Sequence, residues 1–249
     1  MSKTIGIHSF RRGTGTSVFA MNISALLALE GLRVGLIDTN FRTPGLHILA
    51  GMGEDEIEFT LNDYLWGRCG IENTVYEVTS RLDMDIEGQL FLIPASTKTI
   101  EVARLFREGY AVETLDKAFR ELQETLELSA LLIDTPAGLS EETLRSIVLV
   151  DSLAIILRPD QQDYQGTAVT VDLTRRLNIP STLLVVNQVP NFYDFDQVRR
   201  RVEETFDCQV AAVLPNVDEL AFGDGIFVLS YPNHPLTIDL LRIAVDLLE

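Results

Sequence analysis

Residues 11–17, with the sequence Arg-Arg-Gly-Thr-Gly-Thr-Ser, have the composition of a turn that binds an anion. They follow an apolar, strand-like run at residues 4–8 and precede a helix-like run at residues 18–29. Glycines let a backbone approach a ligand closely, while the N–H groups and the dipole at a helix start attract negative charge. The order of strand, glycine turn and helix therefore predicts a phosphate-binding loop.

The loop departs from the P-loop motif at two positions. Phe10 stands where the motif has its first glycine, and Thr16 stands where it has its lysine, so that only Gly15 and the hydroxyl of Ser17 are in register. The motif's lysine makes charge-assisted hydrogen bonds to the β and γ phosphates, each contributing about 1.5–3 kcal/mol. Its absence predicts weaker phosphate binding unless another cation substitutes.

Two aspartates follow runs of apolar residues that have the character of buried strands. Asp38 ends the run at residues 34–38, and Asp134 ends the run at residues 130–134, just before Pro136. In open parallel sheets, ligands bind outside the carboxyl ends of the strands. We therefore expect Asp38, Asp134 and the glycine loop to converge on one edge of a sheet.

Apolar strands and amphipathic helices alternate along the whole chain, without a repeat, a low-complexity segment or a linker. Strands are expected near residues 4–8, 34–38, 90–94, 130–134, 152–157, 182–187 and 209–214. Helices are expected near residues 17–30, 99–107, 111–126, 141–149, 163–177, 194–206 and 235–248, with a short one at 62–66. This rhythm predicts an α/β fold with a doubly wound, mainly parallel sheet and helices on both faces, in a single domain over residues 1–249.

The composition is that of a cytoplasmic protein. Hydrophobic residues make up 46% of the 249, which suffices for strands covered on both faces. The two cysteines, Cys69 and Cys208, have no metal-binding or disulfide spacing and indicate a reducing compartment. No apolar stretch approaches the roughly 18 residues of a membrane span, and the N-terminus has no signal-peptide core.

The charge is strongly negative, with 20 Lys and Arg against 37 Asp and Glu and a formal net charge of −17 at pH 7. Such a field repels phosphate backbones, so DNA binding would require a local basic patch. Candidate patches are residues 199–201, residues 175–176 and the pair Arg104 and Arg107. The alternative is that these arginines lie on solvated helix faces and pair with nearby glutamates.

Taken in order, these motifs resemble the ParA/MinD group of deviant Walker-A ATPases, whose loop reads Lys-Gly-Gly-x-Gly-Lys followed by Thr or Ser. Arg11 occupies the position of the group's signature lysine, and Thr16 that of its P-loop lysine. The resemblance continues through residues 36–38, 134–136, 185–187 and 213–216, which read Leu-Ile-Asp, Asp-Thr-Pro, Val-Val-Asn and Val-Leu-Pro-Asn. It thus covers nearly the whole chain.

The resemblance implies ATP and ADP as ligands and Mg²⁺ as the metal. Ser17 would bind the metal directly, and Asp134 would hold it through water. Asp38 would lie in the switch region beside the metal site and orient the attacking water. The alternative for Asp38 is a structural one, in which it caps the following segment, residues 40–49.

Four cations could replace the missing lysine. Arg11 is the first choice, because in the resembled group this position crosses a sandwich dimer to the partner's nucleotide, and arginine offers a bidentate fork. Arg158 follows the apolar run at residues 153–157 and would lie at the ligand edge. Lys98 and Arg12 are the remaining candidates. The alternative for each is a surface charge.

The nucleobase end of the site is also implied. Asn187 ends an apolar run and offers both a donor and an acceptor for adenine, although a strand-terminal Asn is often only a turn residue. The resembled group uses the following loop as well, here residues 215–217, and Asp218 would lie near the ribose. The predicted nucleotide-binding set is Arg11, Arg12, Gly13, Thr14, Gly15, Thr16, Ser17, Val18, Arg158, Asn187, Pro215, Asn216 and Val217.

The resemblance also implies partners: an ATP sandwich homodimer and an adaptor protein. The segment 239–249 is amphipathic but carries three acids and one base, which argues against a membrane partner. No helix-turn-helix segment precedes the loop, as in small members that use the nucleoid through nonspecific DNA contacts. Within the group, the altered loop resembles the carboxysome-positioning McdA type, so the expected adaptor is of the McdB or ParB type.

Two other classes of protein remain open. A pseudo-ATPase scaffold would bind nucleotide without turnover, as the loss of the lysine at Thr16 suggests. An NAD-binding protein would use Gly13 and Gly15 after a strand and Asp38 after the next one. In that reading Val18 replaces the third glycine, and the Asp-Thr-Pro motif at residues 134–136 has no function.

Overall fold

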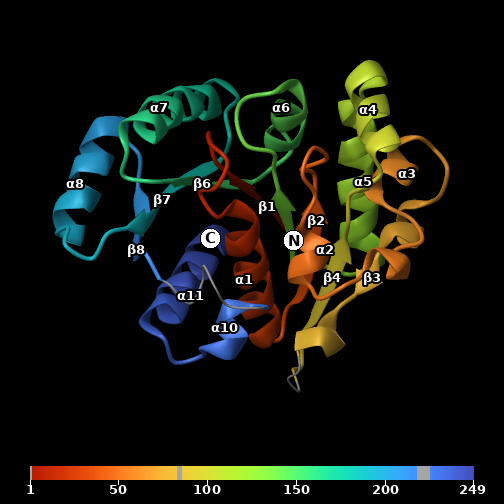
Figure 1. Cartoon of the computed structure of the whole chain (residues 1–249), viewed down its shortest axis with the longest axis horizontal. Helices are drawn as coiled ribbons and strands as arrows, with labels where there is room; N and C mark the ends of the chain where they lie inside the picture. The colour runs from red at the N-terminus through yellow and green to blue at the C-terminus, as the bar shows by residue number, and fades with distance from the viewer. Residues whose placement is uncertain (1, 83–85, 218–224) are drawn as a thin grey trace.

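A single eight-stranded sheet organises the computed structural model, which describes residues 2–82, 86–217 and 225–249 (Figure 1). The strands are β1 Lys3–His8, β2 Arg33–Asp38, β3 Tyr76–Glu77, β4 Gln89–Ile93, β5 Ala130–Asp134, β6 Ser152–Leu157, β7 Ser181–Val189 and β8 Val210–Pro215. Their order is β3-β4-β2-β5-β1-β6-β7-β8. All neighbouring strands are parallel except β3, which pairs antiparallel with β4. The predicted doubly wound, mainly parallel sheet is confirmed.

The strand β3 is the one that the sequence pattern did not reveal. It has only two residues, Tyr76 and Glu77, and pairs with Leu92 and Phe91 at the edge of the sheet. A two-residue strand has no apolar run to detect, because tertiary pairing rather than local burial defines it.

The helices expected from periodicity lie within two residues of their predicted positions. The helices are α1 Thr16–Leu29, α2 Leu46–Leu49, α3 Leu61–Leu65, α4 Thr99–Glu108, α5 Val112–Thr125, α6 Glu141–Ile147, α7 Gln161–Arg176, α8 Phe195–Phe206, α10 Phe227–Ser230 and α11 Pro235–Leu248. The single turns α2 and α10 were not predicted, because four residues are too few to show a helical period. Short 3₁₀ turns occur at Glu54–Glu56, Ile71–Thr74 and Thr79–Leu82. No helix in the three described ranges is both long and apolar enough to cross a bilayer.

Two apolar cores cover the two faces of the sheet. On one face, α1, α10 and α11 pack together, and α1 is buried along most of its length, from Phe19 to Ala28. On the other face, side chains from α5, α7 and α8 pack against the opposite sides of the same strands. Burying α1 between the sheet and α11 fixes the loop from which this helix begins.

The carboxyl ends of the central strands lie together. Strand β5 runs between β2 and β1, and Asp38 stands opposite Asp134 in the register of β2 and β5. Strand β1 lies between β5 and β6. The strands β2 and β4 lie on one side of it and β6, β7 and β8 on the other, so the strand order changes direction beside β1. In an open α/β sheet, this point is where ligands bind. The topology thus positions the glycine loop and both aspartates as expected.

Candidate functional site

The glycine loop has a backbone that other residues would strain. Gly13 has a φ of +80° and Gly15 a φ of +94°, both in the left-handed region that glycine adopts freely. A side chain at Gly15 would also begin 3.1 Å from Nδ2 of Asn187. Gly15 is the N-cap of α1, and no side chain in the described part of the chain caps this helix start. The first N–H groups of α1 are therefore free to bind an anion.

A hydroxyl and a carboxylate meet directly beside this helix start. The Ser17 Oγ donates a 2.5 Å hydrogen bond to Oδ2 of Asp134, whose side chain is buried. The other oxygen, Oδ1 of Asp134, is buried without a hydrogen-bond partner among the described residues. Burial and the nearby Asp38 carboxylate raise the pKa of Asp134 well above its usual value. A buried carboxylate oxygen without a protein partner is suited to binding a cation.

The Asp38 carboxylate is also buried but is largely satisfied by backbone. Oδ1 accepts the N–H of Asn40 at 2.9 Å, and Oδ2 accepts those of Gly45 at 3.1 Å and Leu46 at 3.4 Å. Burial raises the pKa of Asp38 to about 6, and these three hydrogen bonds partly oppose the rise. Asp38 therefore caps the following segment, while about one lone-pair position on Oδ1 stays open.

The donor set fits magnesium better than a metal held by protein ligands alone. No group of three or more His, Cys, Asp or Glu side chains converges on a metal position within the described ranges. Magnesium typically keeps several waters and binds through one or two protein oxygens plus substrate phosphates. Ser17 Oγ and the unpartnered Oδ1 of Asp134 offer such oxygens. Of the three residues predicted at the metal site, Asp38 is the one whose oxygens are mostly engaged elsewhere.

Arg11 and Arg158 meet at the start of α7, where they share two aspartates. Arg11 pairs with Asp160 at 3.3 Å and with Oδ1 of Asp163 at 3.1 Å, and it also donates to Gln162. Arg158 pairs with Oδ2 of Asp163 at 3.3 Å and with Asp160 at 3.6 Å. The Asp163 side chain is only 2% exposed, so it is enclosed between the two arginines. Both cations are thus held beside the glycine loop by carboxylates.

The other two candidate cations lie elsewhere. Arg12 is exposed to solvent. Lys98 directly precedes α4 and lines a small pocket with Glu58 and Glu101. Among described residues, this pocket shares no lining residue with the one beside Gly15. The structure thus brings Arg11 and Arg158 together but places Lys98 in a separate pocket.

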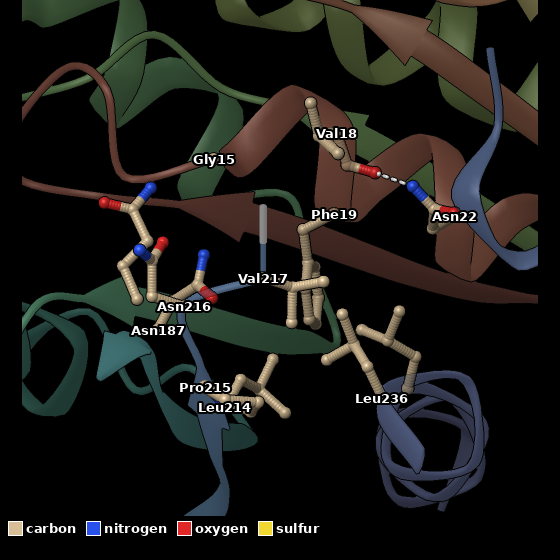
Figure 2. Close-up of a pocket in the computed structure, with 12 residues that line it drawn as sticks. Gly15, Val18, Phe19, Asn22, Asn187, Leu214, Pro215, Asn216, Val217 and Leu236 are labelled. Atoms are coloured by element: carbon tan, nitrogen blue, oxygen red, sulfur yellow. Dashed lines mark hydrogen bonds between the residues drawn. The ribbon is translucent and has the colours of Figure 1, made fainter. Parts of the chain in front are cut away.

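A pocket of about 130 Å³ opens directly beside Gly15 (Figure 2). It is lined by six residues that the sequence analysis assigned to nucleotide binding, namely Gly15, Val18, Asn187, Pro215, Asn216 and Val217. Figure 2 shows the amides of Asn187 and Asn216 on the side nearer Gly15, with Phe19 and Leu236 farther along the apolar wall. A slot with an apolar wall and a few amides suits a planar heteroaromatic ring. Asp218, expected near the ribose, lies outside the described residues.

Several lining residues were missed from sequence, namely Phe19, Asn22, Gln188, Leu214, Leu236 and Leu240. Phe19 and Asn22 follow the loop on α1, and their spacing of one and two turns from Gly15 could have revealed them. Leu236 and Leu240 belong to α11, more than 200 residues away along the chain. Only the packing of α11 against α1 brings them to the pocket.

His8, at the end of β1, is a further buried polar residue that was missed. Its Nδ1 lies 2.9 Å from Oγ1 of Thr135, and that hydroxyl donates to the carbonyl of Ile7 at 2.9 Å. Burial lowers the pKa of His8 to about 3, so the ring is neutral at physiological pH. Because the Thr135 hydroxyl already donates a hydrogen bond to the carbonyl of Ile7, Nδ1 of His8 is the donor in the hydrogen bond between His8 and Thr135. The neutral histidine thereby ties the turn after Asp134 to the base of the glycine loop.

Comparison with known proteins agrees with this geometry. A family model described as an AAA domain matches residues 2–180. An uncharacterised ATP-binding protein of Methanocaldococcus jannaschii is 27% identical over 252 residues, covering 100% of this chain and 88% of that protein. The septum site-determining protein MinD of Bacillus subtilis is 26% identical over 192 residues, covering 77% of this chain and 66% of that protein.

Solved structures share the fold across the whole chain. MinD of Pyrococcus horikoshii, complexed with Mg-ADP, has a TM-score of 0.79 at 19% identity and covers 99% of this chain and 96% of its own. A Cyanothece McdA variant complexed with ATP has a TM-score of 0.80 at 19% identity, with the same coverage. The architecture is that of MinD/ParA P-loop NTPases. The chain therefore belongs to the AAA domain family, and it is similar to MinD proteins over most of its length.

Proposed function

We propose that the protein is a magnesium-dependent ATPase that forms an ATP sandwich dimer and uses this switch to position or partition an intracellular cargo. The observation that carries the proposal is the hydrogen bond from Ser17 to the buried Asp134, whose Oδ1 has no partner among the described residues, beside an uncapped helix start. The relatives support it, because they include proteins named for cell division and for ATP binding.

In this proposal, each part of the site has a separate function. The N–H groups from Gly13 to Val18 bind the phosphates, and the pocket beside Gly15 holds adenine with Asn187 and the loop at residues 215–217. Ser17 and Asp134 hold magnesium, which neutralises charge on the β and γ phosphates when bound. Asp38 orients the attacking water through the open position on its Oδ1.

A titration separates this proposal from its two alternatives. Calorimetry of the purified protein with ATP, ADP and NAD, each with and without magnesium, should show tight binding of ATP and ADP that depends on magnesium. A pseudo-ATPase scaffold would bind ATP equally but release no phosphate over hours. Preferential binding of NAD without a magnesium effect would overturn the proposal.

We expect one of the candidate cations to replace the missing lysine. Removing the true substitute should weaken ATP binding by about 10-fold to 100-fold, or about 1.4–2.8 kcal/mol, because it removes a charge-assisted hydrogen bond to phosphate. Arg11→Ala, Arg158→Ala and Lys98→Ala are to be compared by calorimetry, with Thr16→Ala as the control that should change affinity much less. If all three variants bind ATP like the wild type, the backbone cradle and magnesium suffice without a cation.

The ion pairs at α7 add a condition to this prediction. Arg11 and Arg158 can reach a phosphate only by exchanging their contacts with Asp160 and Asp163. If one arginine moves to a phosphate, the buried Asp163 stays paired with the other arginine, whereas moving both would leave a buried carboxylate without a cation, at a cost of about 3–5 kcal/mol. The proposed dimer would supply such an anion in the partner's nucleotide.

We propose that the ATP-bound dimer binds nonspecific DNA, and that the basic patch on α8, residues 199–201, contacts it. Arg199 is engaged, since it donates to the backbone carbonyls of Val210 and Ala211. Arg200 and Arg201 are exposed and line a groove between α7 and α8 together with Tyr164 and Tyr193. Two exposed arginines in each subunit would form a doubled patch in the dimer.

Replacing Arg200 and Arg201 with alanine is expected to abolish an ATP-dependent mobility shift on arbitrary duplex DNA. For each phosphate that the variant no longer neutralises, the slope of log affinity against log salt should also become shallower by about 0.9. Arg242→Ala is a matched control, because Arg242 lies outside the candidate patches, is exposed on α11 and pairs with Asp239 at 3.2 Å. If the wild type shows no shift with ATP at about 50 mM salt, the net charge of −17 prevents DNA binding.

The most specific part of the proposal is the identity of the cargo and of the adaptor protein. The fold similarity to McdA and the altered loop favour a carboxysome-like cargo with an adaptor of the McdB type. A plasmid-like or chromosome-like cargo with a ParB-type adaptor is the alternative. Either requires the protein to associate with the nucleoid, which the DNA measurement tests.

A further inference from the structure

Two consecutive amide side chains at the end of β7 bind the backbone of the glycine loop. Asn187 Nδ2 donates to the carbonyl of Thr14 at 2.8 Å, and Gln188 Nε2 donates to the carbonyl of Gly13 at 3.1 Å. The two amides are separated from the loop by more than 170 residues of sequence. Thus one strand end contacts two adjacent peptide groups of the loop.

The backbone of β7 is distorted where this contact occurs. Consecutive side chains of a regular strand point to opposite faces of the sheet, so both amides could not reach one loop. The pairing of β7 with β8 shifts register between Val186 and Val189, and Gln188 has a left-handed φ of +57°. A non-glycine residue in this region is uncommon and strained, and such strain gathers at functional positions. The distortion lets Gln188 contact the same loop as Asn187.

Fixing these two carbonyls also fixes two N–H groups. In a trans peptide, the C=O of one residue and the N–H of the next lie in one plane and point in opposite directions. Holding the carbonyl of Gly13 therefore directs the N–H of Thr14, and holding the carbonyl of Thr14 directs the N–H of Gly15. These N–H groups belong to the phosphate cradle, and glycine at positions 13 and 15 leaves the loop free to rotate without such restraints.

We propose that Gln188, acting with Asn187, is a positioning residue that pre-organises the phosphate cradle and offsets the loss of the P-loop lysine. A cradle whose N–H groups are already oriented loses less conformational entropy when phosphate binds. Asn187 lines the base pocket as well, so the same strand end connects base and phosphate subsites. The consequence for affinity rests on the proposed nucleotide-binding function, whereas the ordering of the loop does not.

Hydrogen exchange of the nucleotide-free protein tests the proposal directly. Gln188→Gly removes the amide and keeps the left-handed backbone, and Gln188→Glu keeps the size but cannot donate. Both variants should speed exchange in a peptide covering residues 9–19 by about twofold to tenfold, the change expected when one hydrogen bond is removed. Gln209→Glu is the matched charge control, because Gln209 is exposed just before β8.

Three outcomes decide the question. Faster exchange confined to the loop, with α5 protected as in the wild type, supports the positioning role. Unchanged exchange in the loop of both variants, or an equal increase in α5, would overturn it. Calorimetry with ADP then separates the two proposals: faster loop exchange in a protein whose wild type binds no nucleotide leaves the positioning role standing and removes the ATPase proposal.

Discussion

Replacing Asp38 with asparagine is expected to slow ATP turnover by about 100-fold to 10,000-fold while leaving ATP affinity nearly unchanged. The buried carboxylate has one open acceptor position on Oδ1, and asparagine removes both the charge and the capacity to receive a proton. Phosphate release and calorimetry on the same preparation provide the measurement.

A matched control for this variant is available at the opposite end of the sheet. Asp151 accepts the backbone N–H of Thr4 at 2.8 Å, so Asp151→Asn also perturbs a carboxylate that caps backbone but should keep normal turnover. Loss of ATP binding in Asp38→Asn would show that Asp38 is purely structural, in its role as the cap of residues 40–46. Unchanged turnover would remove it from the reaction.

The second large effect concerns stability and pH in the absence of nucleotide and magnesium. Burial raises the pKa of Asp38 from 3.8 to about 6, so the folded state favours the protonated carboxyl. The stabilising contribution of the protonated form is complete below about pH 3.8 and is lost as the pH rises through about 6. From pH 4 to pH 8, the unfolding free energy of the wild type should therefore fall by about 2–3 kcal/mol relative to Asp38→Asn, which does not titrate.

Urea unfolding of both proteins in metal-free buffer measures this difference. If the unfolding free energy of the wild type minus that of Asp38→Asn stays constant with pH, folding does not shift the pKa of Asp38. If this quantity rises with pH, the Asp38 carboxylate is stabilised as an anion in the empty site. Magnesium with ADP should reverse the trend for the wild type, since a cation beside Asp134 favours both carboxylates in their charged form.

Much of the fold could be predicted because buried parallel strands appear in the sequence as continuous runs of apolar residues. Residues 130–133 and 153–157 are apolar throughout, and both runs lie in inner strands of the sheet. The position of Asp38 and Asp134 followed from the rule that parallel strands end at one edge. The strand β3 could not be predicted in this way, because it has only two residues and is defined by its pairing with β4.

The sequence predicted the placement of candidate-site residues that open a helix, as Ser17 does, or end an apolar run, as Asn187 does. The sequence did not reveal that Asp163 is enclosed between Arg11 and Arg158, because Arg11 lies in a loop about 150 residues before α7. The contact of Gln188 with the glycine loop could not be predicted for a similar reason. Its reach to Gly13 depends on a register shift and a left-handed backbone that no residue pattern marks.

The most direct measurement of the proposed switch is the solution mass of Asp38→Asn by light scattering, with magnesium and either ATP or ADP. An ATP-dependent sandwich dimer predicts twice the monomer mass of 27.8 kDa with ATP and the monomer mass with ADP. A monomer at saturating ATP, in a variant that calorimetry shows to bind it, would contradict the switch.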